Sequence, residues 1–241
     1  MKGKLGSFLQ NLIPRPTPEA DLVMIDPWDV RTHSIRRAEQ LGYATNPNLP
    51  LLNKPSHMRS EDEVFQRMMC VFITSACAYG VEKKDGMDWL AKEGFSGALT
   101  SQESAFLKGD ERNVETFKGR VEALYVLAWS LSFISRLDYH DAGEDDFIHI
   151  FPNLKTGQTA VKMRAKVKPR PVSKVFKHLD LTYCLHLAIV DAQIKGKRLP
   201  GDVHPAVVYH RRWALEWLLE ADDWDNVQID TQTNIPPDSP G

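Results

Sequence analysis

The chain has 241 residues, of which 42% are hydrophobic, and its 30 basic and 32 acidic residues give a formal charge of −2. This length suits one large domain or two small ones, and the hydrophobic fraction is typical of a folded soluble protein. Proteins dedicated to nucleic acid gain most of their affinity by neutralising phosphates, so the near-neutral charge argues against that class. We therefore do not expect a nucleic-acid partner.

The three cysteines, Cys70, Cys77 and Cys184, all lie in apolar stretches. They form no CxxC pair and no spacing with histidine that suits zinc, so we expect buried free thiols, no metal site and no cofactor. The N-terminal MKGKLGSFLQNLIP is too broken for a signal peptide, and no window approaches the ~18 apolar residues of a membrane span. These features together predict a cytoplasmic protein without a membrane span.

Prolines separate the beginning of the chain from the rest. Residues 1–28 include PRPTPEADLVMIDPW, a composition that predicts an extended N-terminal arm. A helical domain is expected over 29–231, with Asp29 capping a first helix that runs to about Leu41. A proline-rich, flexible tail is expected over 232–241.

The first core helix is predicted to begin after Ser60, which has Glu63 at the spacing of a capping box. It should run to about Tyr79, with Glu63 and Arg67 one turn apart on its exposed side. No charge follows Arg67 until Glu82, so the rest of this helix is predicted to be deeply buried.

A second core helix is expected over 112–136. Its stretch 121–134, VEALYVLAWSLSFI, contains a single charge, Glu122, and a helix that is apolar on all sides belongs in a core. Thr100 and Glu103 form another capping-box pattern at the start of a shorter helix. The remaining helices are expected over 86–93, 101–108, 172–195 and 205–220.

One region has a different periodicity. Residues 147–151, FIHIF, are β-branched and aromatic, and residues 160–168, AVKMRAKVK, alternate apolar and basic. Alternation is typical of a half-exposed strand, and the turn-rich PNLKTGQ between the two segments suggests a hairpin. The predicted fold is therefore mainly α, a single-domain orthogonal array of six to seven helices with an optional small β-hairpin near 147–168.

Basic residues concentrate just before the long helix at 172–195. One interpretation is a patch that binds phosphate or an acidic partner, and the other is the solvated face of an edge strand, which we favour. No aromatic residues are interleaved to stack bases, which argues against single-strand binding. The residues of this basic stretch are Lys162, Arg164, Lys166, Lys168 and Arg170, followed by Lys174 and Lys177.

Polar residues inside the apolar helices are the candidate functional residues. Asp180 and Asp191 lie on one flank of the apolar stripe of the 172–195 helix and His186 on the other, while Glu122 lies inside the second core helix. A buried carboxylate is rare unless it is paired, because desolvating a lone charge is costly. The expected partners are Arg59, Arg67, Arg211 and Arg212.

These residues allow three interpretations. In the first, which we favour, they are structural ion pairs and hydrogen bonds between helices. In the second, Glu122, Asp180 and His186 converge as the acid and base groups of a hydrolase-type enzyme. A metal site built from the same three residues is a minor third option, because the Glu-x-x-His pairs of bundle metal sites are missing.

The C-terminal third carries HRRWALEWL (210–218) and WDNVQIDT (224–231). The tryptophans and leucines of both segments are expected to close the core. Asp225 and Asp230 are predicted to accept hydrogen bonds from helix ends or from Arg211. The predicted structural polar network consists of Arg59, Glu63, Arg67, Arg211, Asp225 and Asp230.

At these residues the sequence resembles the bacterial family known as domain of unknown function 4272. The elements that carry the resemblance follow one another in order over about 31–231: RRAEQLGY, Arg59 with EVFQRMMCV, Glu122-Ala123 leading to LAWSL, PVSKVFKHLDLTYCLHLAIVDA, HRRWALEWL and WDNVQIDT. The sequence departs from the family pattern at three positions. Cys184 stands where arginine is expected, Leu187 where tryptophan is expected, and Asn226 where an acid is usual, so a charge interaction of the family is in doubt here.

The resemblance implies a mostly helical fold and no established activity, cofactor or substrate. We expect a non-enzymatic bacterial protein that binds another protein, in an immunity-like or accessory role beside a secreted toxin; this expectation rests on analogy with such families. The alternative is the hydrolase-type enzyme described above.

Overall fold

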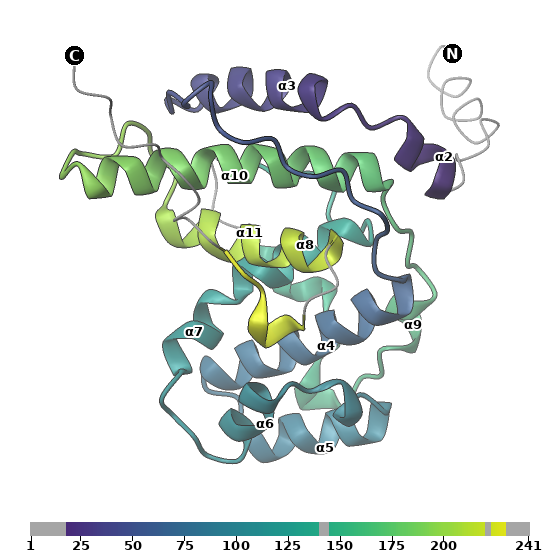
Figure 1. Ribbon diagram of the computed structural model, residues 1–241. Helices are drawn as coiled ribbons and strands as arrows, with labels where there is room; N and C mark the ends of the chain where they lie inside the picture. Colours follow the sequence, from purple (N-terminus) through teal and green to yellow (C-terminus); the bar gives the residue numbers. More distant parts are fainter. Residues whose placement is uncertain (1–17, 140–144, 220–222, 230–241) are drawn as a thin grey trace, which may run out of the picture.

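The computed structural model describes residues 18–139, 145–219 and 223–229. Within these ranges the chain forms ten α-helices and no β-strand (Figure 1). The α-helices are α2 (Pro18–Val23), α3 (Pro27–Gln40), α4 (Glu61–Ala78), α5 (Lys83–Glu93), α6 (Ser101–Leu107), α7 (Val114–Gly119), α8 (Val121–Ser130), α9 (Val161–Arg164), α10 (Val172–Ile194) and α11 (Pro205–Leu219). Short 3₁₀ helices are η1 (Ser96–Ala98), η2 (Asp145–Ile150), η3 (Leu154–Thr156) and η4 (Trp224–Asn226).

The helices are stacked in layers around α10, the longest of them. Figure 1 shows α3 lying across one side of α10, with α11 and α8 on the other side and α4 beyond them. The short helices α5, α6 and α7 pack on α4. The helices α4 and α8 form much of the core, because they are buried along almost their whole length. None of the helices among the described residues is long and apolar enough to cross a membrane.

The two predicted capping boxes are confirmed. Ser60 and Glu63 exchange side-chain and backbone hydrogen bonds at the start of α4, and Thr100 and Glu103 do the same at the start of α6. In each box two of the backbone N–H groups that a helix leaves unpaired at its beginning are satisfied. The local sequence therefore determines where both helices begin.

The predicted beginning of the first helix is wrong. Asp26, not Asp29, caps α3, because its carboxylate accepts hydrogen bonds from the backbone N–H groups of Trp28 and Asp29. Proline at the next position suits the first helical turn, where no N–H is needed. The arm expected to be extended also contains α2. There Asp21 accepts hydrogen bonds from the backbone and hydroxyl of Ser173, which ties α2 to the start of α10.

The helix predicted over 112–136 is two shorter helices, α7 and α8. The chain turns between them at Gly119 and Arg120, where the ring of His210 lies so close that a Cβ on Gly119 would be 2.2 Å from Nε2. The second helix ends at Ser130, and Ser132 adopts a left-handed conformation with φ of 65°. This split, together with α2 and α9, raises the helix count above the six to seven expected.

The β-hairpin predicted near 147–168 is also wrong, because this region forms η2, η3 and α9. Phe147 and Phe151 are four residues apart, a helical spacing, and both are buried. Phe151 stacks on Phe72 with ring centroids 4.8 Å apart, and Phe147 packs edge-on to Tyr125. Burial of these aromatic rings outweighs the β-propensity of the isoleucines, which depends on a partner strand.

The three cysteines are buried free thiols, as predicted. Burial raises the pKa of Cys70 and Cys184 to about 12 and that of Cys77 to about 11. Because the thiolate is the reactive form, these cysteines are inert packing residues.

Candidate functional site

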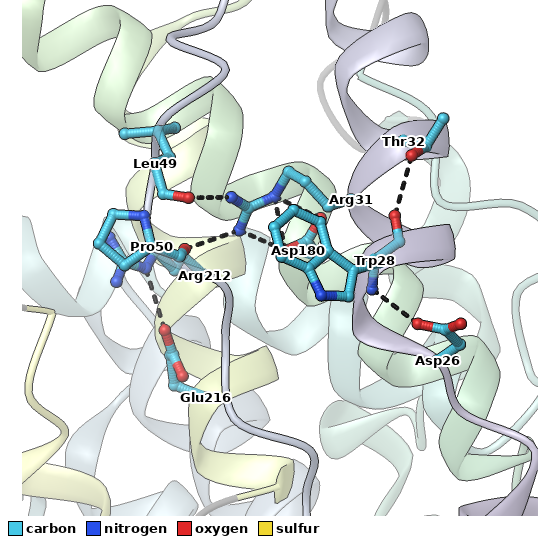
Figure 2. Close-up of polar contacts among 9 residues, drawn as sticks. All are labelled: Asp26, Trp28, Arg31, Thr32, Leu49, Pro50, Asp180, Arg212 and Glu216. Carbon is cyan, nitrogen blue, oxygen red and sulfur yellow. Dashed lines mark hydrogen bonds and ion pairs between the residues drawn. The ribbon is translucent and has the colours of Figure 1, made fainter.

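Asp180 of α10 pairs with an arginine that was not among its predicted partners. Arg31 of α3 donates hydrogen bonds from Nε and Nη2 to the Asp180 carboxylate, the shortest at 2.7 Å, and both side chains are buried (Figure 2). The other donors of the same guanidinium reach the carbonyls of Leu49 and Pro50. Burial lowers the pKa of Arg31, but the bond and charge of Asp180 outweigh it and the net shift is upward. The pair joins α3, α10 and the loop after α3.

His186, also on α10, faces α11. Its Nδ1 lies 3.0 Å from Nη1 of Arg212, which donates to it, and Nε of Arg212 lies 3.1 Å from Glu216 one turn along α11. Burial, with the nearby charge of Arg212, lowers the pKa of His186 to about 4. The guanidinium carbons of Arg212 and Arg31 lie 5.0 and 5.3 Å from the centroid of the Tyr183 ring. His186 is therefore a neutral acceptor within a packed network.

Glu122 of α8 is paired with Arg211 of α11. The distance from Nε of Arg211 to the Glu122 carboxylate is 2.8 Å, and the arginine is fully buried. Arg211 also donates to the carbonyl of Asp138, and its guanidinium packs against the rings of Tyr125 and Tyr139. This pair connects α8 with α11.

Two further arginines of the predicted polar network lie around α4. The spacing of Glu63 and Arg67 predicted that these two side chains pair. Instead, the Glu63 carboxylate lies 3.6 Å from the guanidinium of Arg59, four residues before it. Arg67 points inward and binds Glu103, so that one carboxylate caps α6 and neutralises a buried cation. Arg59 also donates to the carbonyl of Trp217 and stacks on its ring, which fixes the loop before α4 to α11.

Asp225 accepts hydrogen bonds at the end of a helix, which is one of its two predicted roles. Its carboxylate accepts hydrogen bonds from the hydroxyl of Ser101 and the backbone N–H of Gln102, at the start of α6. Arg211, the other predicted partner, binds Glu122 instead. Asp230 lies outside the described residues.

The basic stretch is not the face of a strand, since its first residues lie in α9. Arg164 pairs with Asp62 and Glu61 at the start of α4. Arg170 donates to the carbonyls of Trp129 and Ile134, both at 2.6 Å, and so holds the chain that leaves α8. The two arginines are thus structural ties, and the side chains exposed to solvent are those of Lys162, Lys166 and Lys168.

The three candidate catalytic residues lie at three different helix interfaces. Asp180 faces α3, Glu122 faces α11 from α8, and His186 faces α11 from α10, each bound to its own arginine. In the parts of the chain that the structure describes, no cluster of three or more histidine, cysteine, aspartate or glutamate side chains is placed to hold a metal ion. This arrangement favours structural ion pairs over a catalytic group.

Arg31 and Glu103 are the important residues that sequence reasoning missed. A signal for Arg31 was present, because Arg31, Ser34 and Ala38 share one face of α3, and that face is buried. Glu103 was assigned only its capping role, and nothing in the local sequence indicated that it also binds Arg67 across 36 positions.

Two hollows open at the surface away from these pairs. The larger, of about 940 Å³, lies between α4, the start of α8 and the segment 147–158. Its lining includes Phe72, Tyr79, Phe147, Ile148 and Phe151, and we call it the aromatic groove. Tyr79 is 67% exposed and Ile148 is 41% exposed, which is unusual for large apolar side chains on adjoining segments.

The smaller hollow, of about 310 Å³, lies between α3, α10 and the chain that follows α8. Its charged and titratable lining residues are Arg37, Arg136, Asp138, Lys174 and His178, and we call it the basic pocket. Trp129 forms part of its wall, with its ring edge-on to His178 at 4.6 Å.

Most of the sequence matches the model of one known family. Residues 31–227 match the model of the family described as Domain of unknown function (DUF4272). The chain belongs to this family. No curated protein and no solved structure matches it. The DUF4272 match therefore identifies the family without assigning an activity, and the function must be inferred from the geometry above.

Proposed function

We propose that this DUF4272 protein is a non-enzymatic binding protein that holds an apolar segment of a partner protein in the aromatic groove. The observation that carries the proposal is the groove itself, an open hollow of about 940 Å³ with two large apolar side chains exposed beside it. Contiguous exposed apolar surface marks interaction sites, and aromatic residues are enriched at the centres of protein interfaces. An immunity-like or accessory role in the bacterial cytoplasm is part of the proposal.

The charge of the groove restricts its partner. Among the described residues that line it, Lys155 is the only one with a formal charge, and it is exposed. A partner segment with apolar side chains in the groove and an acidic residue beside them would match this surface. Complementary charge contributes mainly to specificity and to the rate of association.

The charged interior supports the same proposal by contrast. A catalytic acid or base must reach a substrate, whereas the carboxylates of Glu122 and Asp180 are bound to arginines between helices. The groove offers hydrophobic contact area, and none of its described lining residues is a carboxylate. Its shape and chemistry suit binding rather than catalysis.

The experiment compares two double variants of the full chain. Tyr79→Ser with Ile148→Ser removes exposed apolar side chains from the groove region, while Val161→Ser with Ile194→Ser removes equally exposed ones elsewhere. Proteins captured from the native cells by the unaltered chain are identified, purified and titrated against each variant by calorimetry. We expect the groove variant to bind at least about tenfold more weakly, a loss of about 1.4 kcal/mol, and the control to bind like the unaltered chain.

Lys155→Glu sharpens the test, because reversing the groove's charge should slow association with an acidic segment. A partner that binds both double variants equally well would contradict the proposal.

A further inference from the structure

The basic pocket carries more positive than negative charge. Its lining contains three cationic side chains, Arg37, Arg136 and Lys174, and one carboxylate, Asp138, a formal excess of two positive charges. Asp138 is already engaged, because it accepts a hydrogen bond from the backbone N–H of Tyr139 and lies 3.8 Å from Arg37. Among the described lining residues, the remaining cations therefore lack an opposite charge.

Several donors of the pocket are unused. Neither Arg136 nor Lys174 makes a side-chain hydrogen bond or ion pair with any residue in the ranges 18–139, 145–219 and 223–229. Nδ1 of His178 is fully buried at the pocket and also has no partner among those residues. Buried polar atoms in native proteins are almost always hydrogen-bonded, so His178 is an unsatisfied group beside two cations that have no partner in those ranges.

The charges around His178 also favour an anion in the pocket. Burial, then the charges of Lys174 and Arg170 before it and of Arg211 on α11, lowers the pKa of His178 to about 4. Trp129 of α8 packs on the ring, and Arg37, Arg136 and Asp138 complete the surrounding charges. The cations near His178 therefore come from several different parts of the chain.

We propose that the basic pocket binds a small phosphate-bearing anion, with its phosphate group held by Arg136, Lys174 and the ring of His178. A phosphate monoester carries close to two negative charges near neutral pH, which matches the formal excess in the pocket. Arginine and lysine are the usual phosphate ligands, and a histidine ring that lines the pocket can donate a hydrogen bond. The cavity of about 310 Å³ is at the lower limit for small-molecule sites and leaves room for a small organic group. This site is separate from the aromatic groove and does not depend on it.

The test titrates inorganic phosphate into the full chain at constant ionic strength, with calorimetry and the NMR signals of the His178 ring as readouts. The double variant Arg136→Ala with Lys174→Ala is compared with Lys177→Ala and Arg198→Ala, which removes the same two charges from exposed positions outside the pocket. We expect saturable binding that is at least about tenfold weaker in the pocket variant and unchanged in the control. Bound phosphate should also raise the pKa of His178, because its negative charge offsets the surrounding cations.

Three results would overturn the proposal. The first is the absence of saturable phosphate binding, and the second is equal weakening in both double variants, which would indicate diffuse attraction to the surface. The third is acetate binding as tightly as phosphate, which would make the site a carboxylate site. If the alanine variant fails to fold, as seen by circular dichroism, Arg136→Gln with Lys174→Gln retains most of the side-chain packing and gives the same comparison.

Discussion

Arginines lie both at the helix interfaces and in the basic pocket, and they differ in their partners. Between the helices, Arg31, Arg211 and Arg212 are each bound to an acidic partner and buried. In the basic pocket, Arg136 has no partner within the described part of the chain. The difference teaches that the arginines that stabilise this fold are both buried and paired, whereas the exposed Arg136 is available to a ligand.

The largest expected effect comes from breaking the Arg31–Asp180 pair. Arg31→Ala leaves the Asp180 carboxylate buried without its cation and should lower the free energy of unfolding by about 3–5 kcal/mol. Urea denaturation of the purified chain measures this loss. Arg36→Ala, an exposed arginine on the same helix, is the control and should change stability by less than about 0.5 kcal/mol. Equal stability of the two variants would show that the pair is not structural.

The buried histidines predict a dependence on pH of nearly the same size. The pKa values of His178, His186 and His210 are each lowered to about 4, chiefly by burial. The unfolded chain therefore binds more protons than the folded chain below about pH 6.5, and stability must fall as the pH drops from about 6.5 towards 4. We expect a loss of about 1–2 kcal/mol for each histidine between pH 7 and pH 5.

Denaturation at pH 7 and pH 5 measures this slope. His210→Gln should reduce the slope by about a third, since it removes one of the three groups. His33→Gln is the control, because that side chain is 62% exposed and meets solvent in the folded and unfolded chain alike. An identical slope for His210→Gln and the unaltered chain would contradict the account of the histidines.

A smaller effect is expected at the junction of α7 and α8. A Cβ on Gly119 would lie 2.2 Å from the ring of His210, so Gly119→Ala should cost about 1–3 kcal/mol by overpacking. Gly97 has no atom within 4 Å of an added Cβ, and Gly97→Ala is therefore a matched control with little expected change. Thermal unfolding of the two variants makes the comparison, and a destabilised Gly97→Ala with an unaffected Gly119→Ala would oppose it.

Patterns confined to a few neighbouring residues predicted this structure well. The capping boxes at Ser60 and Thr100 are local hydrogen-bond arrangements, and both are present. The burial of Asp180 and the partial burial of Glu122 also followed from the apolar residues around them. Their partners did not, because Arg31 lies 149 positions from Asp180 and Arg211 lies 89 from Glu122. Pairing at such distances is set by how the helices pack.

The wrong predictions also arose from contacts between residues that are distant in the sequence. Alternation at 160–168 predicted a strand, but a strand requires a neighbour to complete its hydrogen bonds, and none exists in the described ranges. The helix predicted over 112–136 is divided at Gly119 and Arg120, where His210 of α11 packs between α7 and α8. The aromatic groove and the basic pocket could not be predicted either, since each is formed by segments that are distant in the sequence.

The most direct test of the central claim measures two quantities on two variants: the free energy of unfolding and the affinity for the captured partner. Asp180→Asn disrupts a buried pair, and Tyr79→Ser with Ile148→Ser alters the aromatic groove. We predict that Asp180→Asn is less stable while its folded molecules bind the partner normally, and that the groove variant is stable but binds at least about tenfold more weakly. A folded Asp180→Asn protein that no longer binds, beside a groove variant that does, would contradict the account.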